Sequence, residues 1–245
     1  MLLPEMLNDR KNWRKGAAGD PFFPKTVLLC GFEGADGATT TTDQSAAPKT
    51  LTFVGDAQID TAQAKIGSSS VLFDGTGDAI TAPDSPDFTF GSLPFTVELF
   101  VRFATGFSAS EAFCGQWGSS VTNCSWFFWL SSGSLQFRFY DTSSTTRDTE
   151  VAWTPAVDTW YHLAADRDEF NNFRIYRDGN MVAKTIYTQT MRDGTGLFGI
   201  GTVPGQTTLA PLNGWIDELR ITKGVARYAS DSGFSVPTAA FPRFA

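Results

Sequence analysis

Apolar and polar residues alternate at period two along much of the chain, which is the pattern of β-strands with two unlike faces. Residues 95–103 keep this alternation throughout. Residues 126–130 and 135–140 flank a short Ser/Gly turn and predict a hairpin, and residues 160–167 and 173–177 predict a second hairpin across an Asn-rich turn. The pattern therefore predicts an antiparallel, all-β protein.

The strands begin at an apolar run, residues 26–32, and recur between turn signals up to the C-terminus without a break in composition. No helix longer than a turn or two is predicted after residue 25. Short strands at this spacing are typical of a two-sheet sandwich, and single sandwiches commonly reach this length. We expect one domain over residues 26–245, preceded by a short irregular arm over residues 1–25.

The strand predicted over residues 214–222 carries an unusual carboxylate. Asp217 alternates in step with Leu219 and Ile221, so the pattern predicts that its side chain points to the same, apolar side. A carboxylate that points into a core is costly unless it is hydrogen-bonded or bound to a cation. Asp217 therefore requires a partner.

The composition allows a large core and restricts the partners. Of 245 residues, 42% are hydrophobic, with 22 Phe and 7 Trp, so the chain can bury a substantial interior. The net charge of −7 argues against a nucleic-acid partner. No run approaches ~20 apolar residues, and the first residues lack the features of a signal peptide. We expect no membrane span and synthesis in the cytoplasm.

The charge is unevenly distributed. Residues 1–25 carry a net charge of +2 and the rest of the chain −9. A basic leader on an acidic body indicates an arm that anchors the domain on a neighbour, although a solvated tail is the alternative. The candidate anchoring residues are Arg10, Lys11, Trp13, Arg14, Lys15, Phe22 and Phe23.

The three cysteines do not form a complete disulfide set, because their number is odd. Cys30 lies in an apolar run, where a buried free thiol is ordinary. Cys114 and Cys124 could bridge a hairpin, but reduced thiols are favoured in the absence of an export signal. Whether these two pair stays open at this stage.

The residues needed for catalysis are missing from the pattern. Glycoside hydrolysis needs two close carboxylates, and no strand carries an alternating array of them, since Glu98 stands alone on its strand. Asp166, Asp168 and Glu169 run into a turn and are interpreted as a solvated hairpin end. The single histidine, His162, lies within a strand and is interpreted as a packing residue. We therefore expect that this chain is not an enzyme.

A binding role has better candidates. Trp117 and Trp129 could stack on sugar rings, with Asn123 and Arg138 as polar contacts, and these four are the predicted ligand-binding residues. The alternative is that most of the aromatic residues belong to the core. In the strand over residues 126–130 both faces are apolar, which predicts that both are covered.

Five segments, taken in order, resemble the laminin G-like members of the concanavalin A-like jelly-roll superfamily. They are residues 73–80, 95–101, 160–164, 175–179 and 214–228. The last of them is similar to the version common in bacteriophage structural proteins. The resemblance covers the whole body and implies two stacked antiparallel sheets, with the first and last strands adjacent.

The resemblance also implies a partner for Asp217. Many relatives hold a structural Ca²⁺ through an acidic residue after the first strand, carbonyl groups of a Gly-containing turn and the last-strand Asp. The matching positions here are Glu33, Gly75 or Gly77, and Asp217, all of them oxygen donors suited to Ca²⁺. Without metal, Asp217 would accept backbone N–H groups or pair with an arginine, Arg220 or Arg227.

Two functions remain at this point. The first, implied by the phage-like ending and the basic leader, is a virion structural protein, such as a capsid decoration or tail-associated subunit. It would be assembled in the host cytoplasm, with other virion proteins and further copies of itself as partners. The alternative is a glycan-binding module that recognises a bacterial surface polysaccharide.

Overall fold

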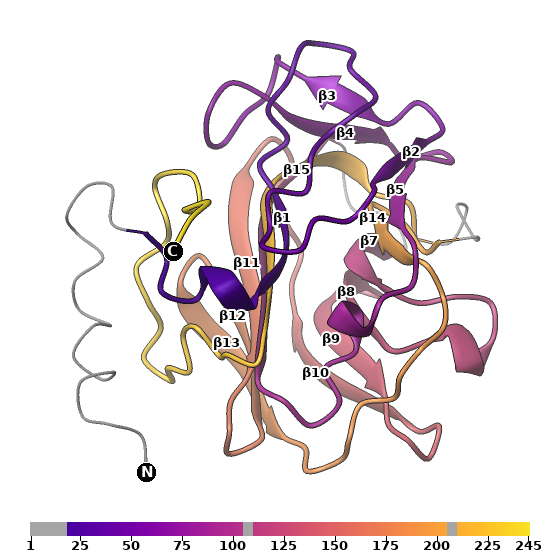
Figure 1. The fold of residues 1–245 in the computed structure, drawn as a ribbon, viewed down its shortest axis with the longest axis vertical. Helices are drawn as coiled ribbons and strands as arrows, with labels where there is room; N and C mark the ends of the chain where they lie inside the picture. Colours follow the sequence, from indigo (N-terminus) through magenta and orange to yellow (C-terminus); the bar gives the residue numbers. More distant parts are fainter. Residues whose placement is uncertain (1–18, 105–109, 205–209) are drawn as a thin grey trace.

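The computed structural model describes residues 19–104, 110–204 and 210–245. Two antiparallel β-sheets, called here sheet A and sheet B, lie face to face, with sheet A on the left and sheet B on the right of Figure 1. Helical structure in these residues is limited to short 3-10 turns, η2 (Phe23–Lys25), η3 (Pro86–Phe88) and η4 (Val121–Asn123). The predicted all-β, two-sheet jelly-roll sandwich is confirmed.

Sheet A has eight strands and contains both the first and the last strand of the chain. Its order is β13-β12-β11-β6-β15-β4-β3, and β1 pairs with β15 beyond the end of β4. The strands are β1 (Thr26–Cys30), β3 (Gln58–Asp60), β4 (Ser70–Asp74), β6 (Phe95–Phe103), β11 (Trp160–Arg167), β12 (Asn172–Arg177), β13 (Asn180–Ile186) and β15 (Asn213–Lys223). The expected adjacency of the first and last strands is therefore present.

Sheet B has seven strands in the order β10-β9-β8-β7-β14-β5-β2. They are β2 (Thr52–Val54), β5 (Ala79–Ala82), β7 (Ser110–Gln116), β8 (Trp126–Ser131), β9 (Ser134–Tyr140), β10 (Thr146–Ala152) and β14 (Phe198–Ile200). Both predicted hairpins form, as β8–β9 and β11–β12. The sequence pattern had not indicated β2, β7 or β10.

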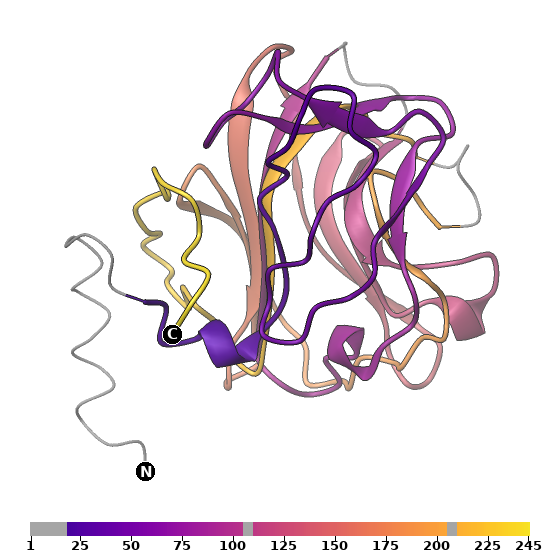
Figure 2. The same ribbon diagram turned by 45° about the horizontal axis from the view of Figure 1, so that its top comes forward.

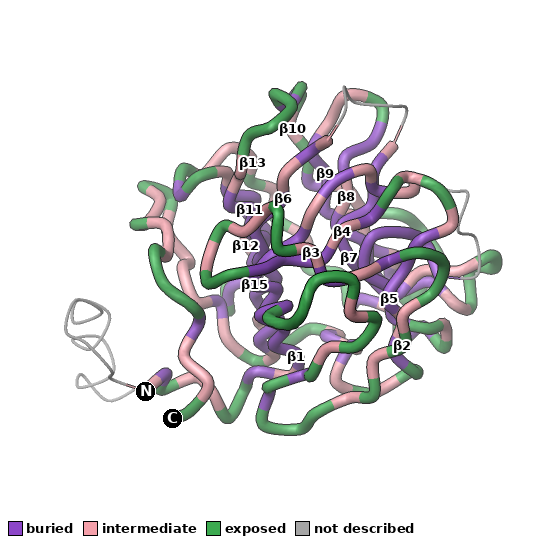
Figure 3. The backbone as a smooth tube through the Cα atoms, turned by 90° about the horizontal axis from the view of Figure 1, so that it is seen from above, coloured by how far each residue is buried: buried purple, intermediate pink, exposed green. Residues whose placement is uncertain are grey.

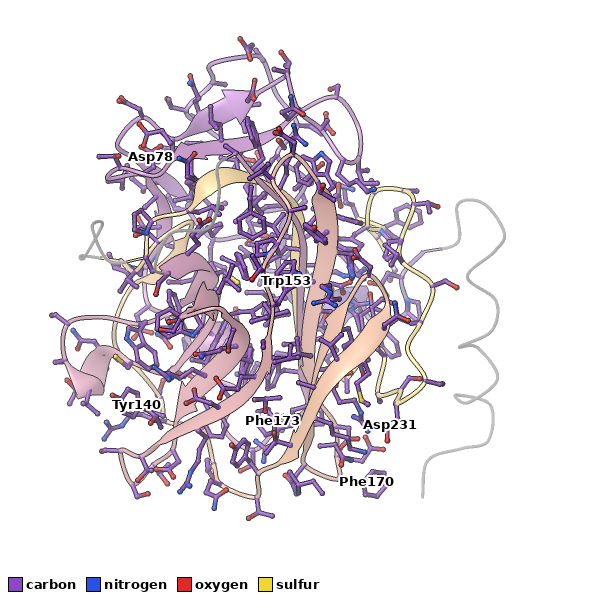
Figure 4. The ribbon with its side chains drawn as sticks, turned by 180° about the vertical axis from the view of Figure 1, so that it is seen from behind. Asp78, Tyr140, Trp153, Phe170, Phe173 and Asp231 are labelled. Carbon is purple, nitrogen blue, oxygen red and sulfur yellow. The ribbon has the colours of Figure 1, made fainter. Side chains whose placement is uncertain are left out.

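Aromatic side chains from the two sheets meet in the core. Phe95 of sheet A stacks on Phe137 of sheet B, and Phe173 of sheet A stacks on Phe139 of sheet B, both with ring centroids 5.1 Å apart. Figure 4 places Phe173 between the sheets, and Figure 3 shows the buried segments running through the middle of the molecule. The many Phe and Trp residues thus hold the two sheets together through large buried ring surfaces.

The strand β15 is interrupted by a bulge that changes the predicted direction of Asp217. Its pairing with β6 shifts between Asp217 and Arg220, and Glu218 adopts a φ of 48°. Ile216 and Leu219 both reach the core although they are three residues apart. Asp217 therefore points to the outer side of sheet A, and the prediction that it points inward with Leu219 was wrong. A bulge inserts one residue and breaks the period-two alternation.

Both ends of the described chain cover the outer face of sheet A. The C-terminal segment, residues 225–245, lies on the side of sheet A that faces away from sheet B (Figures 1 and 2). Residues 19–25 join it there, since Asp20 accepts hydrogen bonds from Arg227 and donates its own N–H to the Phe244 carbonyl. Of the predicted anchoring residues, Phe22 lies near the Arg227 guanidinium and Phe23 begins η2. The other five, Arg10, Lys11, Trp13, Arg14 and Lys15, lie outside the described residues.

Candidate ligand-binding face on sheet B

The outer face of sheet B carries a row of aromatic side chains. On β8, Trp126, Phe128 and Leu130 point into the core, so Phe127 and Trp129 point outward, as the sequence pattern predicted. The inner side is covered by sheet A, and the outer side packs against Val203 and Ala210 from the connection between β14 and β15. We call this surface, with the outward residues of β9 and β10, the sheet-B outer face.

The aromatic row runs from Tyr140 to Trp129. Trp117 stacks on Tyr140 with ring centroids 5.0 Å apart and lies 6.0 Å from Phe127, and Phe127 lies 5.3 Å from Trp129. Phe127 is buried, whereas Trp117, Trp129 and Tyr140 are partly exposed. Figure 4 shows Tyr140 on the sheet B side, far from Asp231 on the sheet A side. The row therefore presents aromatic surface to solvent on both sides of a buried ring.

Polar side chains border the row on β9 and β10. Arg138 lies over the Trp129 ring at 5.2 Å and donates two hydrogen bonds to Asp148, at 2.6 and 3.0 Å. Gln136, directly opposite Trp129 in the strand register, donates from Nε2 to Glu150 at 2.7 Å. The hydrogen bond to Asp148 is the largest cause of the raised pKa of Arg138. Arg138 is thus held as a cation against the indole.

The structure brings together three of the four predicted ligand-binding residues. Trp129 and Arg138 are in contact, and Trp117 joins them through Phe127. Asn123 lies against Gly118, and its Oδ1 accepts hydrogen bonds from the hydroxyl groups of Thr122 and Thr195 at 3.4 Å each, so it braces a loop.

The sequence interpretation missed Asp148 and Glu150. They alternate on β10 and share the sheet-B outer face, because they pair across to Arg138 and Gln136. The statement that no strand carries alternating carboxylates was therefore wrong. The alternation of residues 147–151 was a usable signal, but this short, highly charged segment was not identified as a strand.

Asp217 and Glu33 both accept hydrogen bonds from one turn, residues 65–68, which precedes β4. Asp217 Oδ2 accepts the backbone N–H groups of Lys65 and Ile66, each at 2.9 Å, and Glu33 accepts the N–H and hydroxyl groups of Ser68. Burial is the largest cause that raises the pKa of Asp217 to about 7. Of the partners considered without metal, the backbone N–H groups are the ones present.

The glycines of the predicted calcium set lie elsewhere. Gly75 follows β4 and sits against Asn213, four residues along β15 from Asp217, which corresponds to roughly 13 Å of strand. Gly77 lies two residues further along the same turn, and its carbonyl oxygen faces Gly55. In the described part of the chain no three His, Cys, Asp or Glu residues form a cluster that could hold a metal ion. The four-residue set thus does not converge, while Asp217 Oδ1 has no hydrogen-bond partner, and Ca²⁺ binding stays a prediction.

The outer face of sheet A holds buried charges under the C-terminal segment. Glu98 accepts hydrogen bonds from Arg220 and Tyr228, and His162 Nε2 lies 3.4 Å from it. Burial opposes ionisation of Glu98 most strongly, but the neighbouring cations outweigh it and lower the pKa of this carboxyl. His162 packs edge-on against Phe100 and is buried, which agrees with a packing role.

The carboxylates of the β11–β12 hairpin are also buried. Asp166 and Asp168 are 1% and 4% exposed and surround Arg174, so the interpretation as a solvated hairpin end holds only for Glu169. The three cysteines are free and buried, which leaves Cys114 and Cys124 unpaired with each other. No helix within residues 19–104, 110–204 and 210–245 is long and apolar enough to cross a membrane.

The fold and this face define a jelly-roll β-sandwich with both ends of the described residues on one sheet and an aromatic row on the other. The chain belongs to the concanavalin A-like lectin/glucanases superfamily, because a laminin G-like family model of that description matches residues 74–228. No curated protein sequence shows significant similarity to the chain.

Solved structures with the same fold include binding domains of clostridial toxins. The binding domain of Paraclostridial Mosquitocidal Protein 1 has a TM-score of 0.66 at 13% identity, over 84% of this chain and 51% of that one. The botulinum neurotoxin serotype G binding domain has a TM-score of 0.63 at 14% identity, over 82% and 49%. The serotype D ligand binding domain in complex with N-acetylneuraminic acid has a TM-score of 0.62 at 12% identity, over 84% and 49%. The chain thus spans about half the length of these structures.

Proposed function

We propose that this chain is a glycan-binding module and that the sheet-B outer face is its binding site. The observation that carries the proposal is the row of partly exposed aromatic rings, Tyr140, Trp117 and Trp129, with Arg138 and Gln136 beside it. Aromatic rings contact the apolar faces of sugars, and fixed polar side chains bind the hydroxyl groups. Membership of a superfamily described by lectins and glucanases supports the proposal.

The polar groups favour binding over catalysis. A glycoside hydrolase needs one carboxylic acid that donates a proton to the leaving group and a second carboxylate close to it. Asp148 accepts both hydrogen bonds of the Arg138 fork, so both of its oxygen atoms already serve as acceptors. Glu150 accepts from a neutral amide. The pair is therefore suited to contact hydroxyl groups.

A glycan array followed by titration of the best ligand tests the proposal. We expect Trp129→Ala and Tyr140→Ala to weaken binding at least tenfold, with circular dichroism spectra like that of the unmodified chain. Phe170→Ala is the matched control, since Phe170 is an aromatic residue 73% exposed at a hairpin tip outside the sheet-B outer face. Absence of binding to every glycan, equal loss in the control, or hydrolysis of the bound oligosaccharide would overturn the proposal.

We also propose that the module is displayed on a particle, as a virion structural protein of the capsid decoration or tail-associated type. The supporting observation is that Asp20 is fixed by Arg220 and Arg227 to the outer side of sheet A, opposite the sheet-B outer face. A domain tethered through the residues that precede Asp20 would present its binding face outward. Deleting residues 1–18 should leave binding intact and abolish incorporation into the particle, and normal incorporation would refute the role of the arm.

A further inference from the structure

The charges on the sheet-B outer face are only partly compensated. Arg138 donates hydrogen bonds from Nε and Nη2 to Asp148. The one cation on this face of the β9–β10 hairpin is therefore paired with one carboxylate. Glu150 is exposed and receives one hydrogen bond, from the neutral Gln136 amide. It forms no ion pair with any residue in the described ranges. The face therefore carries one net negative charge, on Glu150.

One acceptor and one donor beside Glu150 have no hydrogen-bond partner in the described residues, namely Gln136 Oε1 and the Trp129 indole N–H. Because Gln136 donates from Nε2 to Glu150, its Oε1 is directed away, and this atom is buried without a hydrogen-bond partner. Gln136 is only 7% exposed, so water solvates it poorly. An unpaired buried carbonyl is costly, at roughly 1–3 kcal/mol, and a ligand N–H or O–H group that reached it would remove this cost.

The neighbouring indole is suited to a cation as well. Trp129 lies directly opposite Gln136 in the register and already holds the Arg138 guanidinium 5.2 Å from its ring centroid. An indole face attracts a cation through its quadrupole, and a nearby carboxylate adds to the attraction. A carboxylated sugar would meet the uncompensated charge of Glu150 instead, and like charges are a strong means of rejecting a ligand.

We propose that the sheet-B outer face selects saccharides with a free amino group, of the glucosamine type, and rejects carboxylated saccharides. The ammonium group lies between Glu150 and the Trp129 ring and donates to Gln136 Oε1, while neutral hydroxyl groups meet the same acceptors with less gain. This inference rests on the proposed glycan-binding function and adds the charge class of its ligand.

Three β-1,4-linked oligosaccharides of equal length test the selection, namely a chitosan oligomer, a cello-oligosaccharide and an oligoglucuronate. In calorimetric titrations at mildly acidic pH, where the amine is protonated, we expect the chitosan oligomer to bind at least tenfold more tightly than the neutral oligomer. The oligoglucuronate should not bind. The preference should shrink as salt is raised, because both charges are near the surface.

Glu150→Gln isolates the carboxylate. Its amide oxygen can still accept from Gln136, so the hairpin is preserved while the charge is lost. We expect the preference for the amino oligomer over the neutral one to disappear in this variant, whereas Glu169→Gln at the exposed hairpin tip should leave the preference unchanged. Equal affinities in the unmodified chain, or a preference that survives Glu150→Gln, overturns this inference and leaves the proposed function standing. Failure of all three oligomers to bind overturns the inference.

Discussion

Asp20 Oδ2 lies 2.7 Å from Nη2 of Arg227, and this ion pair joins the start of the described chain to the segment that follows β15. Both side chains are buried, and Asp20 also reaches Arg220 at 3.4 Å. Two ends more than two hundred residues apart are thereby held on the outer face of sheet A. Asp20 lies outside the family match, which begins at residue 74 and ends at residue 228, whereas Arg220 and Arg227 lie within it.

We expect Asp20→Ala to destabilise the domain by about 3–5 kcal/mol, because it leaves the Arg227 guanidinium buried without its carboxylate. Urea unfolding measures the loss. Lys184→Ala is the control, since it removes an ion pair with Asp231 in which both side chains are partly exposed, and we expect a cost below about 1 kcal/mol. Equal costs for the two variants would show that the buried pair has no special role.

Truncations should separate the arm from the part that belongs to the fold. Deleting residues 1–18 should leave the unfolding free energy nearly unchanged, whereas deleting residues 1–25 should destabilise the domain as Asp20→Ala does. The reason is that residues 19–25 contribute Asp20 and the hydrogen bond from its N–H to Phe244. Thermal unfolding of the two truncated chains gives the comparison, and similar melting temperatures would contradict the expectation.

The C-terminal segment that covers sheet A, residues 225–245, is expected to be as necessary for stability as the region that the family model matches. Glu218 accepts the Phe241 N–H and the Arg243 guanidinium, each at 2.8 Å, and the Phe241 ring lies 3.8 Å from the Arg220 guanidinium. We expect Arg243→Ala to cost about 1–3 kcal/mol, the value of a hydrogen bond to a charged group. Deleting residues 229–245 should cost more, because it exposes the charged layer beneath. Urea unfolding measures both, and a fully stable deletion variant would refute the role of the cover.

Asp166 should make stability fall as pH rises from about 4 to 7. Burial is the largest cause that raises the pKa of Asp166 to about 7, although the Ala229 N–H and Arg174 favour the ionised form. Since the unfolded carboxyl ionises near pH ~3.9, the folded state binds more protons between these values. The stabilisation is complete below pH ~4 and is lost as the pH rises through about 7.

Asp166→Asn removes this titration and keeps an oxygen that can accept the Ala229 N–H. We expect the slope of unfolding free energy against pH between 4 and 7 to fall by about half, because Asp217, whose pKa burial also raises to about 7, still titrates. Urea unfolding at several pH values gives the slope, with Glu169→Gln as a surface control. An unchanged slope in Asp166→Asn would rule out this carboxyl as the cause.

The sequence predicted what depends on local alternation. The hairpin strands and the two apolar faces of the strand around Phe127 and Trp129 are present. The pairing of the first and last strands, which is also present, was implied by the family resemblance and not by the alternation. The direction of Asp217 was not predictable in this way, because one bulge residue shifts every later side chain by one position.

The C-terminal segment over sheet A and the polar residues beside the aromatic row depend on contacts between segments that are separate in the sequence. Residues 225–245 have no period, so nothing local indicates that Phe241 would lie over Arg220. The role of Asp148 and Glu150 in the candidate site depends on their hydrogen bonds with Arg138 and Gln136 on the neighbouring strand. The aromatic residues of the site could be predicted from residue type. The charge of the site could be predicted only with knowledge of the register between β9 and β10.

Calcium should stabilise the turn held by Asp217 and Glu33 if this turn is the metal site. Asp217 Oδ1 has no hydrogen-bond partner, and a Ca²⁺ ion bound there must displace the proton that the raised pKa retains. Stabilisation should therefore be larger at pH 8 than at pH 6. At a hundredfold excess over the dissociation constant the gain is about 2.7 kcal/mol. For a chain of this size that raises the melting temperature by roughly 5–10 °C.

Asp217→Asn distinguishes calcium from the protonated carboxyl. The amide keeps an oxygen for the Lys65 and Ile66 N–H groups but lacks the negative charge that strengthens Ca²⁺ binding. We expect the variant to lose the calcium-dependent rise in melting temperature and, in chelator at pH 8, to be at least as stable as the unmodified chain, since no buried charge remains. Differential scanning calorimetry with millimolar Ca²⁺ and with chelator gives both comparisons. If the melting temperature of the unmodified chain does not change with Ca²⁺ at pH 8, Asp217 binds no calcium, and its carboxyl group then holds the turn without a metal ion.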